Sequence, residues 1–557
     1  MDNKIVSEDY IDLLVETESL RLFDNADSTF LTFVNSVVHL PRTQFEKCSI
    51  GTYPYYIFPT ILALESMISL ESSGIQRIQN NPALSLFGRG VLVGIVDTGI
   101  EYQHQAFLNN DGTSRIVSIW DQTINENALP PDGFSFGTEY DNAAINMALQ
   151  SNEPLSIVPS QDTIGHGTMI SGIIAGNRNA AANFSGVVPD SELVVVKLKQ
   201  AKQINREIFA IPSDKICYQE TDIIFGISYL LSVAQKLNRP IAICLALGTN
   251  QGGHDGFDVL SRYLEYVTRL PGVGVAVSAG NEGNARRHYK GIIQARQPIV
   301  DFNLRVGENE NGFSMELWQN VPYRLSINIT SPTGENTSPI YPALNECRRI
   351  TFIFEPSVVW VNNFIFEGES GDQLILLRFE NPQPGIWRFQ TQNLDEAPSE
   401  FNVWLPSDNL ISEETFFLEP DPNTTITTPG NAVDPLTVTA YNPESGSIAI
   451  FSSRGYTRTN VIKPELAAPG VDLVCPILNN NYGTVSGTGA ATAHTVGIIA
   501  MILEWAVVRG NYTTINGFDI KQLLIRGANR SQDLIYPNNI WGYGKVDVYG
   551  LFRMLIS

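Results

Sequence analysis

Short, wholly apolar runs alternate along much of this chain with longer segments in which apolar residues recur every three or four positions. The runs are predicted to be buried strands, and the longer segments are predicted to be helices. Strands are expected at Val91–Val96, Leu193–Val196, Ile241–Leu247 and Val273–Val277, and helices at Thr221–Lys236 and Asp258–Leu270. Because a strand covered on both faces is apolar throughout, this alternation predicts an α/β fold with a parallel sheet between two helical layers.

The pattern changes between about residues 297 and 425. There Leu325, Ile327 and Ile329 alternate with polar residues, and turn-forming clusters such as 381–385 separate the runs. This two-residue period is typical of antiparallel β structure, and we expect a β-sandwich. The α/β pattern resumes after Gly430, so the β region is an insertion in the α/β domain.

The first 82 residues mix strand-like and helix-like patterns. Residues 30–40 are apolar and β-branched, residues 59–70 carry apolar side chains at helical spacing, and residues 72–82 are polar with turn residues, as in a linker. We therefore predict an N-terminal α+β domain (1–82), a first α/β part (83–296), an inserted β domain (297–425) and a second α/β part (426–557).

Composition narrows the possible partners. The formal net charge is −22, from 58 acidic and 36 basic residues, and such a surface repels phosphate backbones and anionic membranes. We expect no binding to nucleic acid. The most apolar stretch, Thr495–Val508, contains Glu504 and is short for a membrane span, so no membrane insertion is expected either.

The five cysteines are scattered and form no Cys-x-x-Cys pair, so neither a disulfide framework nor a zinc site is expected. Cys244 lies in an apolar run and is predicted to be a core thiol. No loop has the regular spacing of calcium ligands, and no metal or cofactor is predicted. The first residues lack the pattern of a secretory signal, so we expect synthesis in a reducing cytoplasm.

Four short motifs contain residues that could carry chemistry. Asp97 ends a predicted strand, His166 is flanked by glycines, Asn281 follows another predicted strand, and Ser486-Gly487-Thr488-Gly489 precedes an apolar helix. Each has an ordinary structural explanation on its own: a turn aspartate, a packed core histidine, a glycine-rich turn and a tightly packed helix start. Together they include a carboxylate, an imidazole and an amide, the groups used in acyl-transfer catalysis.

The order of these motifs resembles that of the subtilisin-like serine proteases. The resemblance implies that Asp97 orients the general base His166 and that Asn281 donates to the oxyanion. It also implies that Leu245, Ala246, Leu247 and Gly248 form the edge that pairs with substrate, and that the N-terminal domain is a prodomain.

One position departs from that family. The family has Ser-Gly-Thr-Ser where this chain has Ser486-Gly487-Thr488-Gly489, so glycine stands at the position of the nucleophile. Without a hydroxyl no acyl-enzyme can form. The sequence therefore predicts a pseudoprotease rather than an enzyme.

A finer resemblance is to the Csp group, the germination proteases of clostridial spores. It is carried by Arg115-Ile116, by Ile119 to Ile124 and by Tyr536 to Gly544. That group has a prodomain and a jelly-roll β insertion, and it includes members with degenerate triads that regulate germination without cleaving.

This resemblance implies a regulator that senses or relays a germinant signal to an active Csp protease, which matures a cortex hydrolase. Its expected partners are that protease or the hydrolase precursor, with a small-molecule germinant, and its expected location is the spore. Arg454 and Gly455, in a turn that resembles a family motif, are candidates for signalling. Two alternatives remain open: an active serine endopeptidase that uses another nucleophile, such as Thr488, and a scaffold that senses nothing.

Overall fold

The computed structural model describes residues 3–23, 26–45, 48–64, 71–395, 397–407 and 409–556. At its centre lies an eight-stranded sheet with strand order β24-β23-β12-β10-β5-β8-β6-β7. Neighbouring strands are parallel except for the pair β6 and β7, which confirms the predicted parallel sheet. The bounds are β5 (Leu92–Asp97), β6 (Ile116–Asp121), β7 (Thr138–Asp141), β8 (Glu192–Lys197), β10 (Ile241–Leu245), β12 (Val273–Ser278), β23 (Leu436–Tyr441) and β24 (Leu466–Pro469).

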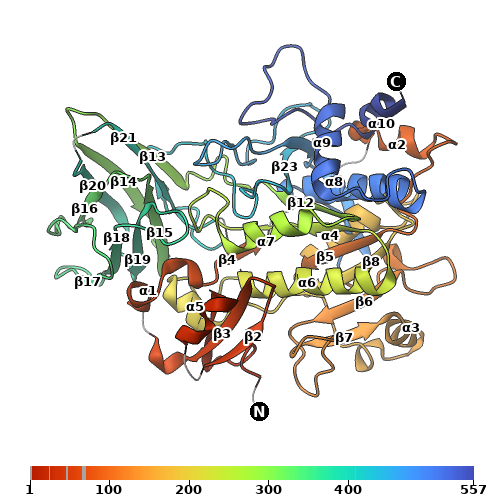
Figure 1. Cartoon of the computed structure of the whole chain (residues 1–557), viewed down its shortest axis with the longest axis horizontal. Helices are drawn as coiled ribbons and strands as arrows, with labels where there is room; N and C mark the ends of the chain where they lie inside the picture. The colour runs from red at the N-terminus through yellow and green to blue at the C-terminus, as the bar shows by residue number, and fades with distance from the viewer. Residues whose placement is uncertain are drawn as a thin grey trace.

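Helices cover both faces of this sheet (Figure 1). α4 (His166–Ala175) and α8 (Thr488–Leu503) pack on one face, and α6 (Glu220–Leu237) and α7 (Val259–Thr268) pack on the other. The segment Thr488–Val508 is long and apolar enough to cross a membrane, but 83% of it is buried inside the protein. It is the central helix of the core. The remaining longer helices are α3 (Asn142–Gln150), α9 (Gly517–Gly527) and α10 (Val548–Ile556).

The inserted region is a sandwich of two antiparallel sheets, as predicted, with strand orders β13-β21-β15-β19-β18-β17 and β16-β20-β14-β22. It projects from one end of the α/β unit (Figure 1). Its core is formed by inward side chains such as Phe302, Leu317 and Trp387. Its assignment as a jelly roll stays a prediction. The bounds are β13 (His288–Ile293), β14 (Ile299–Val306), β15 (Gly312–Gln319), β16 (Leu325–Thr330), β17 (Cys347–Thr351), β18 (Val358–Phe364), β19 (Gln373–Glu380), β20 (Gly385–Asn393), β21 (Ser399–Trp404) and β22 (Phe416–Phe417).

The N-terminal region contains a three-stranded antiparallel sheet in the order β1 (Tyr10–Glu16), β3 (Asn35–Pro41), β2 (Asp27–Phe30). The expectation of a helix over 59–70 is wrong for β4 (Ile61–Leu64), which lies between β9 (Tyr218–Gln219) and β11 (Leu247–Gly248). Helical spacing misled here because distant strands supply the hydrogen bonds of β4. Residues 65–70 lie outside the described residues.

The segment expected to be a linker, residues 72–82, is structured instead. It contains the end of a 3₁₀ turn (Glu71–Ser73) and the helix α2 (Ile75–Gln79), which contacts α10. The Ser73 hydroxyl is 2.8 Å from His494 Nε2 in α8. Residues 71–79 thus pack on the α/β unit, although their sequence is polar and rich in turn residues.

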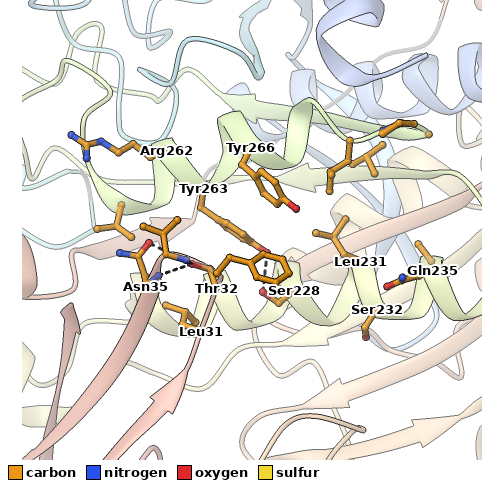
Figure 2. A pocket seen from close by; sticks show the side chains of 18 of the residues that line it. Leu31, Thr32, Asn35, Ser228, Leu231, Ser232, Gln235, Arg262, Tyr263 and Tyr266 are labelled. Atoms are coloured by element: carbon orange, nitrogen blue, oxygen red, sulfur yellow. Dashed lines mark hydrogen bonds between the residues drawn. The ribbon is translucent and has the colours of Figure 1, made fainter. Parts of the chain in front are cut away.

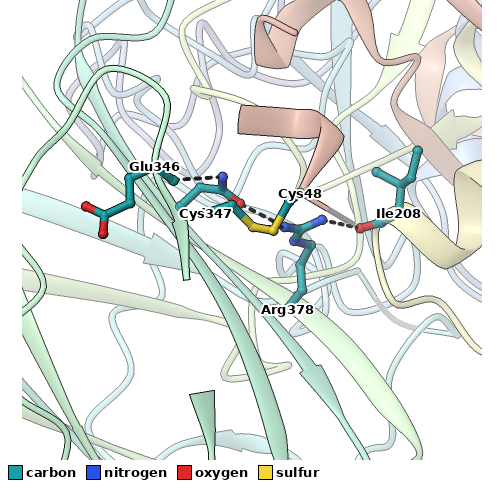
Figure 3. The surroundings of a disulfide bond; sticks show 6 residues. Cys48, Ile208, Glu346, Cys347 and Arg378 are labelled. Carbon is teal, nitrogen blue, oxygen red and sulfur yellow. Dashed lines mark hydrogen bonds between the residues drawn. A yellow bond between two sulfur atoms is a disulfide. The ribbon is translucent and has the colours of Figure 1, made fainter. Parts of the chain in front are cut away.

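A disulfide joins Cys48, just before α1 (Ser49–Thr52), to Cys347 at the start of β17 (Figure 3). The sequence argued against a disulfide framework and did not predict this single bond. The two cysteines are 299 residues apart in sequence, and only the fold brings their Cα atoms to 5.3 Å, so their spacing carried no signal. The bond ties the N-terminal region to the sandwich. Cys217, Cys244 and Cys475 are free and buried, and Cys244 is in the core as predicted.

A second link attaches the sandwich to the α/β unit. Arg458 is buried, and its guanidinium lies 2.6 Å from Asp255 and 2.6 Å from Asp372, which precedes β19. Arg458 also donates to the carbonyl of Gly253 at 2.6 Å. A buried cation with two carboxylates fixes the sandwich in one orientation, because any other orientation leaves charge unpaired.

The N-terminal sheet is attached to the α/β unit through the buried carboxylate of Asp12 in β1. Asp12 Oδ1 is 2.7 Å from His39 Nδ1 and 2.8 Å from Lys202 Nζ, and Oδ2 accepts from Gln219 Nε2 at 3.1 Å. Burial acts to raise the pKa of Asp12, but Lys202 and His39 outweigh it and lower the pKa to about 2 from its usual 3.8. This carboxylate therefore stabilises the folded state above about pH 4, and its contribution is lost as the pH falls through about 2.

We predict that Asp12→Asn accelerates amide hydrogen exchange in β1 and β3 about 100-fold at pH 7. The substitution leaves the buried Lys202 ammonium without its counter-charge, a loss of about 3 kcal/mol. The difference from wild type should narrow between pH 4 and pH 2. Asp27→Asn is the matched control, because Asp27 pairs with Lys4 at the surface and its loss should change nothing measurable. Equal effects of the two substitutions would contradict this account.

Candidate active site

The structure brings together the predicted carboxylate and imidazole. Asp97 is the last residue of β5, and His166 is the first residue of α4. His166 Nδ1 lies 2.8 Å from Asp97 Oδ1 and 2.9 Å from Oδ2, and both side chains are buried. A carboxylate at this distance fixes the tautomer and the orientation of the ring, which is the arrangement that a general base requires.

Asp162, which the sequence analysis did not single out, holds the start of α4. Its Oδ1 accepts from Thr98 Oγ1 at 2.9 Å and from the Gly165 amide at 2.7 Å. Its Oδ2 accepts from the amide and hydroxyl of Thr168 at 2.9 and 2.7 Å. Asp162 therefore positions both the turn after Asp97 and the helix that carries His166. The N-cap position of α4 is Gly165, three residues after Asp162, so the usual N-cap pattern does not mark this aspartate.

The chain approaches itself very closely beside this pair. A Cβ atom on Gly167 would lie 2.1 Å from the carbonyl oxygen of Gly99. Only glycine permits this approach of α4 to the turn after β5. The glycine after the histidine thus has a packing reason, independent of any catalysis.

Asn281 is attached to the start of α8. Its Oδ1 accepts from the Thr488 amide at 3.0 Å and from the Thr488 hydroxyl at 3.2 Å. The same hydroxyl accepts from the Gly280 amide at 3.1 Å. Gly489 is the next residue, buried in α8 with helical backbone, and α8 packs on α4. The structure therefore brings Asn281 beside Gly489. The roles of these residues stay predictions.

The predicted substrate edge is partly occupied by the N-terminal region. Leu247 and Gly248, which form β11, pair with Leu64 and Ala63 of β4. Leu245 ends β10 and pairs with Val277 of the central sheet, and Ala246 lies between the two strands. On its other side β4 pairs with β9. Two of the four predicted residues, Leu247 and Gly248, thus pair with the N-terminal region.

Two polar side chains hold the entry to β4. Gln251 Oε1 accepts from the Ile61 amide at 2.8 Å, and Glu220 Oε2 accepts from the Thr60 amide at 3.1 Å. Glu220 also accepts from the Leu260 amide at 2.7 Å. Burial, together with the charge of Asp258, raises the pKa of Glu220 to about 7. Neither Gln251 nor Glu220 was predicted, because their partners are distant in sequence.

Arg454 and Gly455 lie in a turn beside residues 424–425, directly after Ser453, whose amide donates to the Gly280 carbonyl at 2.9 Å. The Arg454 amide donates to Thr425 Oγ1 at 2.9 Å, and its carbonyl accepts from the Thr425 amide at 2.9 Å. Arg454 is half-buried. A Cβ on Gly455 would lie 1.7 Å from the Lys463 carbonyl oxygen, so this position has no room for a side chain. Within the described ranges, no cluster of three or more metal-ligating side chains is present.

A parallel α/β sheet with an Asp–His pair at the carboxyl end of β5, and an asparagine beside the start of the central helix, defines a subtilisin-like fold. The family model of the Subtilase family matches residues 88–301 and 414–544, which exceed half of the chain. The chain belongs to the subtilase family. The break between the two matched parts contains most of the sandwich.

Among solved structures, the chain is similar to the CspB protease of Clostridium perfringens. The two are 30% identical with a TM-score of 0.78, over 87% of this chain and 97% of that one. Among curated proteins it is similar to the C5a peptidase of Streptococcus pyogenes serotype M18, at 22% identity over 80% of this chain and 38% of the relative. It is also similar to the subtilisin-like protease SBT1.9 of Arabidopsis thaliana, at 24% identity over 79% of this chain and 60% of the relative. The chain thus spans less than two thirds of either curated relative.

We predict that Asp162→Ala lowers the free energy of unfolding by more than about 3 kcal/mol, because it leaves buried amide and hydroxyl donors without an acceptor. The measurement is urea unfolding of the full chain. Asp190→Asn serves as the control, since Asp190 pairs with Arg89 on the surface, and we expect no measurable change there. A loss below about 1 kcal/mol for Asp162→Ala would show that Asp162 is not the main support of α4.

Proposed function

We propose that this chain is a catalytically degenerate subtilase that regulates spore germination instead of cleaving peptides. The observation that carries the proposal is Gly489. It occupies the position of the last serine in the family's Ser-Gly-Thr-Ser motif. Removing the nucleophile from a subtilisin lowers turnover about 10⁶-fold. The Asp97–His166 pair has no hydroxyl at position 489 from which to take a proton.

The position of β4 supports the same proposal. Residues 61–64 pair with β9 and β11, and β11 is part of the predicted substrate edge. A protease must release such a segment before it can bind another peptide. A chain that cannot cut itself retains it, and the groove stays filled.

The similarity to the CspB protease supports the choice of biological process. Within the Csp group, this chain resembles the noncatalytic member CspC most, because glycine stands at its nucleophile position. On this proposal the protein is made in the sporulating cell and packaged in the spore. It senses or relays a germinant signal to an active Csp protease, or binds the cortex hydrolase precursor on which that protease acts.

The alternative of an active peptidase with Thr488 as nucleophile is less well supported. The Thr488 hydroxyl donates to Asn281 Oδ1 and accepts from the Gly280 amide, so it has a structural role at the start of α8. The scaffold alternative, in which no small molecule is sensed, differs from the proposal only in ligand binding. Titration of the pure protein with candidate germinants separates the two.

We predict that the purified chain shows no labelling by a fluorophosphonate probe and keeps its full mass of 61.5 kDa. Without a serine hydroxyl the probe has no atom to phosphonylate. Intact-mass spectrometry measures both results. Stoichiometric labelling that is lost on Thr488→Ala would favour the active-peptidase alternative.

The variant Gly489→Ser tests whether restoring the hydroxyl restores self-cleavage. Gly489 has helical backbone rather than the left-handed conformation that would strain a serine. We therefore expect slow self-cleavage in the N-terminal region, and none in the double variant Gly489→Ser/His166→Ala. N-terminal sequencing locates the cut. The sequence favoured a cut between Gln76 and Pro82, but the helix α2 (Ile75–Gln79) occupies part of that interval. Cleavage in both variants would reveal a contaminating protease.

We predict that spores carrying His166→Ala germinate as wild type does, because signalling needs no general base. Spores lacking the chain should fail to respond to germinant. Release of cortex fragments after germinant addition measures the response, and Arg454→Ala tests whether the candidate signalling turn takes part. Failure of the His166→Ala spores, with normal levels of the protein, would show that the active-site machinery is needed after all.

A further inference from the structure

A cleft of about 1020 Å³ opens between the N-terminal domain and the α/β unit. One wall is the turn that joins β2 to β3, with Phe30, Leu31 and Phe33. The other wall is formed by Leu231 of α6 and by α7 (Figure 2). Tyr263 and Tyr266 of α7 extend toward α6, and Ser228 and Ser232 of α6 also line the cleft (Figure 2). None of the predicted site residues, including Asp97 and His166, lines the cleft.

The walls expose an unusual amount of apolar surface. Phe33 is 84% exposed, Phe30 63% and Tyr266 50%. Single exposed apolar residues are common on proteins, but three aromatic rings around one concave space are typical of a binding site. The volume is at the upper end of the range for pockets that bind one small molecule.

The charges of the walls indicate which kind of molecule fits. Arg262 is paired with Glu369 at 2.6 Å, and Arg239 with Glu192 at 2.6 Å. The Ser228 and Tyr263 hydroxyls lie 2.8 Å apart. The other charged residue that lines the cleft is Glu16, which repels anions. Both arginines are thus neutralised. The Ser232 hydroxyl donates to the Tyr229 carbonyl at 2.7 Å, whereas the Ser228–Tyr263 hydroxyl pair keeps hydrogen-bonding capacity for a polar group of a ligand.

We propose that this cleft binds an uncharged, ring-containing, largely apolar small molecule, held between the aromatic turn of the N-terminal domain and helices α6 and α7. The rings supply contact area, and the Ser228–Tyr263 hydroxyl pair orients a polar group of the ligand. This inference stands independently of the proposed function, because it requires neither loss of catalysis nor a role in spores.

Helices α6 and α7 also connect the cleft to β4, the strand that pairs with the predicted substrate edge. α6 begins at Glu220, whose carboxylate accepts from the Thr60 amide directly before β4 and from the Leu260 amide in the first turn of α7. A ligand that braces the N-terminal domain against α6 and α7 therefore also steadies β4. Ligand binding in the cleft and retention of β4 are coupled through this carboxylate.

The test uses N-phenyl-1-naphthylamine, an uncharged aromatic fluorophore, titrated into the full chain. We expect saturable binding at one site per chain, weakened at least tenfold by Ser232→Trp, which fills the cleft, and by Tyr266→Ala. Phe354→Ala is the matched control, since Phe354 is a 77% exposed ring on the sandwich, outside the cleft. Binding that does not saturate, or that Phe354→Ala weakens as much as Tyr266→Ala does, would overturn the proposal.

Two further measurements test the charge and the coupling. The anionic analogue 8-anilinonaphthalene-1-sulfonate should bind at least tenfold more weakly, and equal or tighter binding would overturn the assignment of an uncharged ligand. The neutral probe should slow amide exchange of residues 61–63 at least threefold in wild type and not in Ser232→Trp. Unchanged exchange in wild type, with the probe bound, would refute the coupling to β4.

Discussion

The antiparallel pairing of β4 with β9 and β11 is the interaction on which the arrangement of this molecule depends. It places a strand of the N-terminal region between two strands of the α/β unit. The buried side chains of Glu220 and Gln251 fix the residues at its entry. Nearby, the Tyr55 hydroxyl donates to Glu316 of the sandwich at 2.7 Å, and Glu316 accepts from the Gly252 amide at 2.9 Å. All three parts of the chain thus meet around one short strand.

The polar contacts between these parts act mainly by defining one arrangement. Burying Asp12, Glu316 or Arg458 is unfavourable until each finds its partners, and the partners lie on another part of the chain. If any part separated from the others, these groups would lose their partners. They would then be either buried without a hydrogen bond or exposed to water. The apolar clusters supply most of the stabilisation, and the buried ions and hydrogen bonds select the geometry. The Cys48–Cys347 bond adds a covalent link between the N-terminal region and the sandwich.

The sequence predicted what local pattern encodes. The central strands are apolar throughout because helices cover both faces, so β5, β8, β10 and β12 were expected within a residue or two of their bounds. Asp97 and His166 were found because each has a distinctive glycine-rich neighbourhood. β4 was missed because its hydrogen-bond partners lie more than 150 residues away in sequence. Glu220 and the disulfide were missed for the same reason. Asp162 has mostly local partners, but it was missed because a single polar side chain gives no periodic signal.

On the proposed function, the geometry explains how a subtilase can lose its nucleophile and keep the rest of the site. Asp162 caps the helix that carries His166, Asn281 pins the start of α8, and Gly167 allows α4 to approach the turn after Asp97. Each of these residues is needed to join a strand end to a helix start, so its removal would weaken the fold. Position 489 is different, because it lies within α8 and the helix forms there without any contact from a side chain at this position. A nucleophilic hydroxyl there serves chemistry alone. On the proposed function, selection for a folded protein would preserve Asp162, Gly167 and Asn281, whereas the oxygen at position 489 could be lost without weakening the fold.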